Sequence, residues 1–389
     1  MIDPAVRLAE LRAAGLERRT RRVDEASGPW VRIDGREVLL LCANDYLGLA
    51  GDERVREAAA GAALRWGAGA GASRLVSGTL PIHEELEARL AAWERRERAV
   101  LFGSGYLANV GVISALAERG DVVFSDALNH ASIVDGCRLS RAEVFVYRHA
   151  DVEHLAWGLA RAEGRGALVV TDSVFSMDGD VAPLAEIVAL ARRWGARTVV
   201  DEAHGTGCLG PGGRGAVAAA GLEEQVDVLV GTLGKALGAY GAYAACGGDL
   251  AALLVSSARP FIFSTAPPPA AAGAALAALA ILEQEPGRPA RLQANAALLR
   301  DALSAHGLDT GGSSTQILPL VVGAAEDAVA AAEGALGEGV FAQAIRPPTV
   351  PAGTSRLRVA VSSEHTPADL RAAADVLARA VRSPLPAAA

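Results

Sequence analysis

The chain has 389 residues, of which 51% are hydrophobic, and its 37 basic and 45 acidic side chains leave a formal net charge of −8. This length predicts two or three domains, or one large α/β unit with an appendage, and the apolar content excludes wholesale disorder. The acidic balance argues against nucleic acid or an anionic membrane as the main partner.

Neither a membrane span nor a secretory signal is expected. The longest apolar stretch, residues 270–282, is too short to cross a bilayer, and the first residues carry acidic side chains and lack an apolar core. The four cysteines are far apart and form no CxxC pair. That pattern is typical of a reduced, cytoplasmic protein with small buried thiols.

The order of elements predicts an α/β fold. An amphipathic helix is expected at 4–16, followed by a basic run at 17–22 and two short strands at 30–33 and 38–41. Helical patterns then alternate with short apolar runs. The helices are expected at 53–66, 81–93, 106–118, 130–139, 151–162 and 183–193, and the strands at 99–102, 122–124, 144–146, 167–171, 198–201, 226–230 and 242–245. Such alternation indicates βαβ units and a mostly parallel sheet, which binds ligands at the carboxyl ends of its strands.

A Pro/Gly-rich break at 285–289 precedes a different pattern. Beyond it we expect a helix at 290–305, a strand at 317–321, a helix at 325–336, strands at 340–344 and 357–361, and a helix at 367–381. The sequence therefore predicts three parts: residues 1–46 with the N-terminal helix and short strands, residues 47–285 as a large α/β domain, and residues 286–389 as a smaller C-terminal α+β domain.

Lys235 is the single lysine of the chain, because the other 36 basic residues are arginine. A compositional bias explains the loss of the other lysines but not the survival of this one. Unlike arginine, lysine can lose its proton and form a Schiff base. It lies in the glycine-rich stretch GTLGKALG, just after the apolar run 226–230. The stretch is not a phosphate-binding P-loop, since Leu229 and Ala236 stand where that motif needs glycine and Ser or Thr.

Asp201 and His204 belong to the segment DEAHGTG, which ends the predicted strand 198–201. The segment could be the magnesium-binding box of a helicase, but the chain has no phosphate loop upstream. A carboxylate at a buried strand end needs a cationic partner, and the pyridinium nitrogen of pyridoxal 5′-phosphate (PLP) is one. A lysine that forms a Schiff base and an aspartate on the ring nitrogen are the minimum PLP constellation.

Four further segments could complete such a site. Residues 103–106 (GSGY) lie between a predicted strand and a predicted helix, where free backbone N–H groups bind anions, although an ordinary βα turn is the alternative. His130 starts a helix and is otherwise a capping or surface residue. Ser176 lies in a segment that also reads as an Asp-Gly turn. Arg346 lies in a proline-rich loop and could bind a carboxylate or face solvent.

No metal site is expected. Residues 83–86 (HEEL) lack the second histidine of HExxH, and the sequence has no Cys/His cluster.

Taken together, the chain resembles the α-oxoamine synthase family of fold-type-I PLP enzymes. The resemblance covers nearly the whole chain and rests on motifs at 42–49 (CANDYLGL), 71–74, 78–79, 83–87, 129–132 (NHAS), 173–180 around Ser176, 201–207, 231–238 and 259–265, while 346–354 (RPPTVPAGT) resembles one branch of the family. It implies a large domain with a mostly parallel sheet flanked by helices, plus a smaller α+β C-terminal domain. It also implies a homodimer.

The resemblance implies a role for each matched residue. Lys235 would bind the cofactor aldehyde as a Schiff base, Asp201 would pair with the pyridine nitrogen, and His130 would stack on the ring. Further cofactor contacts are implied for Gly105, Tyr106, Ser176, His204 and Thr232. Substrate contacts are implied for Arg18, His130, Thr349 and Arg346, of which Arg346 would contact a carboxylate; Arg19, Arg21 and Arg22 are alternatives to Arg18.

The stretch 346–354 indicates the branch of the family that condenses L-alanine with a pimeloyl thioester, with loss of CO2, in biotin synthesis. The acyl donor would be pimeloyl-CoA or pimeloyl-acyl carrier protein. The alternative within the family is a sister enzyme that joins glycine to acetyl-CoA, succinyl-CoA or a long acyl-CoA with the same residues.

Overall fold

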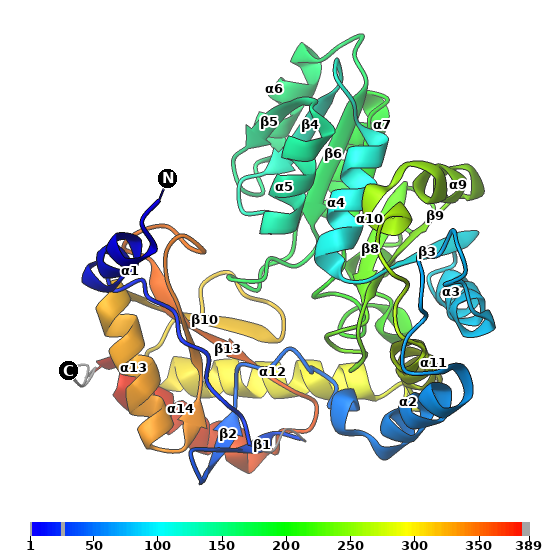
Figure 1. Cartoon of the computed structure of the whole chain (residues 1–389). Helices are drawn as coiled ribbons and strands as arrows, with labels where there is room; N and C mark the ends of the chain where they lie inside the picture. Colours follow the sequence, from blue (N-terminus) through cyan, green and yellow to red (C-terminus); the bar gives the residue numbers. More distant parts are fainter. Residues whose placement is uncertain (1, 25–27, 383–389) are drawn as a thin grey trace. The chain divides into compact units, whose positions relative to one another are not determined.

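The computed structural model describes residues 2–24 and 28–382 (Figure 1). Its backbone contacts divide the chain into two compact units. The larger unit contains Leu49–Ser176 and Val181–Ala290, and the smaller one contains Met1–Gly48, Met177–Asp180 and Arg291–Ala389. Within the described residues, no helix is both long and apolar enough to cross a membrane.

A seven-stranded sheet forms the centre of the larger unit, in the order β3-β9-β8-β7-β6-β4-β5 (Figure 1). Only β9 runs antiparallel to its neighbours, so the mostly parallel sheet predicted from the sequence is confirmed. The carboxyl ends of the other strands therefore meet at one edge. The strands are β3 (Arg98–Phe102), β4 (Val122–Asp126), β5 (Glu143–Tyr147), β6 (Ala167–Asp172), β7 (Arg197–Asp201), β8 (Val228–Thr232) and β9 (Ala242–Cys246).

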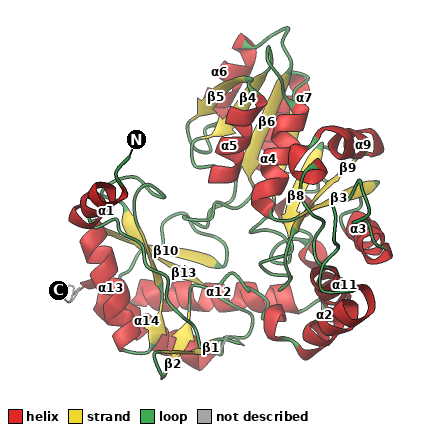
Figure 2. Cartoon of the chain, in the orientation of Figure 1, coloured by secondary structure: helices red, strands yellow, loops and turns green. Residues whose placement is uncertain are grey.

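Helices flank this sheet (Figure 2). Their N-termini follow local sequence signals: the side chain of Asp52 caps α2, Pro81 begins α3, and Ser104 Oγ accepts the Leu107 N–H at the start of α4. The helices and short 3-10 turns of this unit are η1 (Leu49–Gly51), α2 (Glu53–Trp66), α3 (Pro81–Trp93), α4 (Gly105–Leu116), α5 (Ala131–Ser140), α6 (Val152–Arg161), α7 (Leu184–Arg193), η2 (Pro211–Gly213), α8 (Ala216–Ala219), α9 (Gly248–Ser257), α10 (Arg259–Ile262) and α11 (Pro269–Gln284).

The apolar stretch 270–282 lies inside α11, which packs closely on α2. A Cβ at Gly273 would lie 2.7 Å from the carbonyl oxygen of Ala58 and 2.7 Å from Cβ of Ala62. Small residues on both helices therefore permit this close approach, and the stretch is a buried core helix.

An ion pair between the buried Arg74 and the partly buried Glu87 joins the loop before α3 to the helix itself. The guanidinium of Arg74 donates two hydrogen bonds to Glu87, of 2.9 and 2.8 Å, and Oε1 of Glu87 also accepts the Leu101 N–H at 2.9 Å. We expect Glu87→Ala to lower the free energy of unfolding by about 3–5 kcal/mol, because it leaves Arg74 buried without its carboxylate. Chemical denaturation measures this change.

The matched control removes an exposed ion pair, Arg89–Glu283, whose side chains are 45% and 52% exposed. Glu283→Ala should cost less than about 1 kcal/mol. Equal losses in the two variants would contradict the prediction.

The smaller unit holds two three-stranded sheets, β1-β2-β11 and β10-β13-β12. The sequence prediction of one strand at 340–344 is wrong: β11 pairs parallel with β2, whereas β12 pairs antiparallel with β13. The chain changes sheets at Ala342, and a local apolar run carries no information about which strand it will pair with. The elements are α1 (Pro4–Ala13), β1 (Trp30–Ile33), β2 (Arg36–Leu40), β10 (Ile317–Gly323), α13 (Ala325–Gly337), β11 (Val340–Phe341), β12 (Gln343–Ile345), β13 (Ser355–Ala360) and α14 (Pro367–Arg382), with α12 (Arg288–Ala305) beginning before the boundary between the units.

Candidate active site

Asp201 is the last residue of β7, and only 4% of its surface is exposed. Its Oδ2 accepts a 2.6 Å hydrogen bond from Asn109 Nδ2, and its Oδ1 accepts the Ala203 N–H at 2.7 Å. Within the described residues both donors are neutral. A nearly buried carboxylate with neutral donors suits a protonated ring nitrogen, because such a nitrogen would supply the missing positive charge.

Lys235 lies in the turn that follows β8. Its Nζ is 2.7 Å from Nε2 of His204, so the structure brings together the amine and the histidine that follows β7. The turn is tight: the Gly238 N–H donates to the Lys235 carbonyl at 2.9 Å, and Gly238 has φ +59°. A Cβ at Gly238 would lie 2.2 Å from the backbone nitrogen of Ala50, so only glycine fits there.

His130 is held at its backbone and at its ring. Its N–H donates to Asp172 Oδ2 at 2.7 Å, while ring atom Nδ1 lies 2.7 Å from Ser132 Oγ and 3.3 Å from the Ser132 backbone nitrogen. Loss of solvent around the ring lowers the pKa of His130; Asp201 opposes this shift and Lys235 adds to it. This shift favours the neutral form of the ring.

The beginning of α4 offers an anion site. The side chain of Ser104 accepts the N–H of Leu107, and its carbonyl oxygen accepts the N–H of Ala108. The N–H groups of Gly105 and Tyr106 have no partner within residues 2–24 and 28–382. These groups lie at the positive end of the helix dipole, where a phosphate is stabilised. A Cβ added at Gly105 would lie 4.0 Å from Thr232, which places this helix end beside the last residue of β8.

Two other predicted residues have local roles in the fold. The hydroxyl of Thr232 donates to the Gly241 carbonyl at 3.2 Å and helps to close the turn that carries Lys235. Ser176 is half-buried in the loop that follows β6. The site also contains residues that the sequence did not single out, above all Asn109, Ser132 and Asp172, because their roles depend on hydrogen bonds to distant parts of the chain.

Three of the four predicted substrate residues, Arg18, Thr349 and Arg346, lie together in the smaller unit, whereas His130 belongs to the larger one. Arg18 donates to Thr349 Oγ1 at 3.4 Å, and Arg346 donates to the carbonyl oxygens of Gly15 and Glu17. Burial and the positive charge of the neighbouring Arg18 lower the pKa of Arg346, so the two guanidinium groups repel each other. An anion between them would relieve this repulsion.

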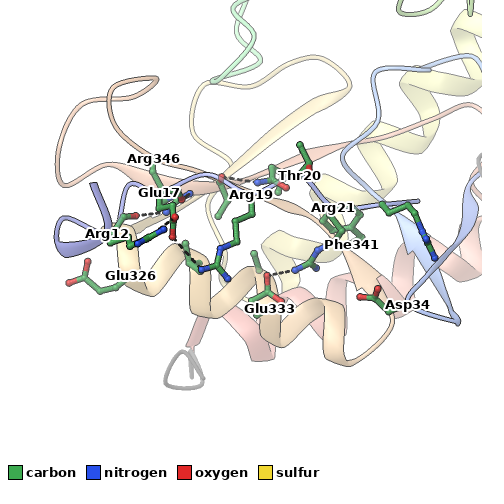
Figure 3. A pocket seen from close by; sticks show the side chains of 16 residues that line it. Arg12, Glu17, Arg19, Thr20, Arg21, Asp34, Glu326, Glu333, Phe341 and Arg346 are labelled. Atoms are coloured by element: carbon green, nitrogen blue, oxygen red, sulfur yellow. Dashed lines mark hydrogen bonds and ion pairs between the residues drawn. The ribbon is translucent and has the colours of Figure 1, made fainter. Parts of the chain in front are cut away.

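A cavity of about 810 Å³ lies beside this group and is lined by Arg12, Glu17, Arg19, Arg21, Arg346 and other residues of the smaller unit. Figure 3 shows the side chains that line it. Three arginines of the basic run bind carboxylates: Arg19 contacts Glu17 at 3.3 Å, Arg21 contacts Glu333 at 2.7 Å, and Arg22 contacts Asp24 at 2.6 Å. Arg18 is the member of the run that contacts Thr349. This difference favours Arg18 over its neighbours as the substrate contact.

The residues of the larger unit fit PLP. Lys235 offers an amine for the aldehyde, Asp201 a carboxylate for the ring nitrogen, and the start of α4 free N–H groups for the phosphate.

Comparisons with known proteins agree with this chemistry. Residues 36–377 match the family model for class I and II aminotransferases. The 8-amino-7-oxononanoate synthase of Anaeromyxobacter dehalogenans is 57% identical over 93% of this chain and 91% of its own length. Among solved structures, serine palmitoyltransferase from S. paucimobilis with a bound PLP–myriocin aldimine has a TM-score of 0.92 at 34% identity, covering 97% of this chain and 96% of that one. The 8-amino-7-oxononanoate synthase of Francisella tularensis has a TM-score of 0.77 at 27% identity, covering 89% and 98%.

Proposed function

The chain belongs to the class I and II aminotransferase family, and we propose that it catalyses the reaction of its 8-amino-7-oxononanoate synthase relatives. In this reaction, a step of biotin synthesis, PLP-dependent decarboxylative condensation of L-alanine with a pimeloyl thioester gives 8-amino-7-oxononanoate, CO2 and the free thiol carrier. The protein is thus a C-acyltransferase. The observation that carries the proposal is the contact of the only lysine with His204, in the same unit as the buried strand-end carboxylate of Asp201.

Five residues and the start of α4 would hold the cofactor. Lys235 would bind it covalently, Asp201 would bind the ring nitrogen, and His204, Ser176 and Thr232 would make polar contacts. The free N–H groups of Gly105 and Tyr106 would bind the phosphate. When bound, PLP supplies an electron sink that stabilises negative charge at Cα of the amino acid.

The chain's own residues would handle the protons. The amine of Lys235 takes the proton from Cα of alanine and later returns one to the product, and His204 holds that amine through the 2.7 Å contact. His130, with its neutral ring, restricts the face on which the acyl donor adds. The negatively charged Asp201 keeps a proton on the ring nitrogen.

Arg18, Arg346 and Thr349 would bind the anionic end of a substrate. We expect Arg18→Ala to raise the KM for the pimeloyl thioester about 10-fold or more, because a charge-assisted hydrogen bond is worth about 1.5–3 kcal/mol. The dissociation constant for PLP should stay unchanged. Steady-state kinetics and cofactor titration measure both quantities.

The matched control is Arg22→Ala, since Arg22 lies in the same run with an 84% exposed side chain bound to Asp24. This variant should behave as the wild type. A KM that rises equally in both variants would assign the effect to the charge of the run and not to Arg18.

We also propose a homodimer. In the larger unit, the segments 71–79 and 259–266 are joined by a bridge between Ser73 and Thr265. They expose apolar side chains that include Val76, at 79%, and Phe263, at 70%. Exposed apolar groups of this size mark association surfaces. Light scattering of the purified protein tests this, and a monomer would contradict it.

Steady-state assays with alanine or glycine, each with pimeloyl-CoA, pimeloyl-acyl carrier protein or acetyl-CoA, test the proposed reaction. We expect turnover with alanine and a pimeloyl thioester. A preference for glycine and acetyl-CoA would identify the sister activity instead. The same assay decides between the two carriers.

The four cysteines are free in the structure and form no disulfide, which supports the proposal of a cytoplasmic location.

A further inference from the structure

A hydrogen-bonded network of buried side chains connects Asp201, the last residue of β7, with His130, which lies in the loop after β4. Asn109 Nδ2 lies 2.6 Å from Asp201 Oδ2 and 2.9 Å from Ser132 Oγ, and Ser132 Oγ lies 2.7 Å from His130 Nδ1. Asn109 is 1% exposed and Ser132 is fully buried. Neither residue belongs to the predicted cofactor or substrate contacts, so this hydrogen-bonded network needs its own explanation.

The donor and acceptor capacities of the side chains determine where the hydrogens lie in this network. A side-chain amide has two N–H groups, and here one points to the carboxylate of Asp201 and the other to Ser132 Oγ. Because Ser132 Oγ accepts this bond, its own O–H is free to donate to His130 Nδ1. The reversed amide would place Asn109 Oδ1 against the carboxylate of Asp201, and both donations would be lost.

The cost of this arrangement is visible in the amide oxygen. Asn109 Oδ1 is buried and accepts no hydrogen bond within the described part of the chain. Buried acceptors are rarely left unsatisfied, so the two donations of Asn109 take precedence over its own acceptor. A residue that only filled space would not require this orientation.

Two donors converge on the same ring atom of His130. Besides the hydroxyl of Ser132, the backbone N–H of Ser132 points to Nδ1 at 3.3 Å. A backbone N–H cannot reverse its role, so Nδ1 must be an acceptor, and a neutral ring then carries its proton on Nε2. We propose that Asn109 and Ser132 are positioning residues that hold His130 as the neutral tautomer with its proton on Nε2.

This inference rests on the proposed function and specifies the part that His130 plays in it. A neutral ring with a proton on Nε2 donates a hydrogen bond from that atom, so His130 would stabilise negative charge on a reacting oxygen and not act as a cation. Asp172 supports the arrangement by accepting the His130 backbone N–H at 2.7 Å. The 2.6 Å bond from Asn109 also holds the carboxylate of Asp201 in position for the cofactor nitrogen.

The direct test is nitrogen-15 NMR of the histidine side chains of the holoenzyme, in which protonated and unprotonated ring nitrogens give separate signals. The chain has seven histidines, and His130→Gln assigns the signal of interest. At pH 7.5 we expect His130 to carry its proton on Nε2 alone. A proton on Nδ1, or on both nitrogens, would overturn the proposal.

Variants then test the two positioning residues. In Ser132→Ala only the longer, 3.3 Å bond from the backbone N–H of residue 132 still holds Nδ1. We therefore expect a detectable population of the second tautomer of His130 and a fall in kcat of about 10-fold or more, with the KM for alanine changing less. Ser132→Thr keeps the hydroxyl and should restore the single tautomer. In Asn109→Leu, which removes both donations at similar volume, the dissociation constant for PLP should also rise, because Asp201 loses its donor.

Ser140→Ala is the matched control, since Ser140 is a buried serine at the end of the same helix whose hydroxyl donates to the Cys137 carbonyl. It should leave the tautomer, kcat and cofactor affinity unchanged. An unaltered tautomer and unaltered kcat in Ser132→Ala would sink the proposal. A wild-type enzyme that makes no product from alanine and a pimeloyl thioester would contradict the proposed function, whereas the tautomer measured by NMR would still decide this inference separately.

Discussion

Replacing Lys235 with alanine should abolish covalent attachment of PLP and lower turnover by about 10³-fold or more, since the variant loses both the Schiff base and the general base. The absorbance of the bound cofactor and the rate of 8-amino-7-oxononanoate formation report the two losses. The test is simplified by the sequence, because Lys235 is the only lysine and no other lysine can react with PLP. Borohydride reduction followed by peptide mass mapping should therefore find one modified lysine peptide in the wild type and none in the variant.

Lys235→Arg is the matched control for charge. Arginine keeps a positive group near His204 but cannot form a Schiff base. We expect the arginine variant to be as inactive as the alanine variant. Activity that survives in either one would contradict the assignment of Lys235.

The second large effect is expected at Asp201. Asp201→Asn should weaken PLP binding and lower kcat/KM by about 10²-fold or more, because breaking a buried charge pair costs about 3–5 kcal/mol. Fluorescence or absorbance titration of the apoprotein with PLP measures the binding, and the steady-state rate measures the activity.

Stability separates this role from a structural one. Asp201 and Asp172 are neighbours across β6 and β7, and burial together with the charge of Asp201 raises the pKa of Asp172. Without cofactor, Asp201→Asn removes a charge that is buried among neutral donors, and this lowers the desolvation cost of folding. The melting temperature of the Asp201→Asn apoprotein should therefore rise while its affinity for PLP falls. A fall in the melting temperature with unchanged affinity for PLP would mean that Asp201 serves the fold and not the cofactor.

The predicted site residues differ in the sequence signal that identifies them. Lys235 could be found because amine chemistry cannot be transferred to arginine, so the residue stands out against the composition of the whole chain. Asp201 could be found because an acid that ends an apolar run is expensive unless a cation meets it. In contrast, the contact between Lys235 Nζ and His204 Nε2 joins the ends of two different strands, and local spacing does not fix such a distance.

The amino-acid sequence alone was enough to predict the alternation of strands and helices in the larger unit and the kind of chemistry that its single lysine can perform, since burial periodicity and side-chain reactivity are local properties. Which residues come into contact depends on the tertiary structure. Of the four arginines at 18–22, Arg18 is the one that contacts Thr349 in the structure. Residues 340–344 are divided between two sheets, and Asn109 contacts Asp201, which lies 92 positions further along the chain. Hydrogen bonds over such separations depend on how strands are ordered in a sheet, and side-chain periodicity sets which face of a strand is buried but not which strand becomes its neighbour.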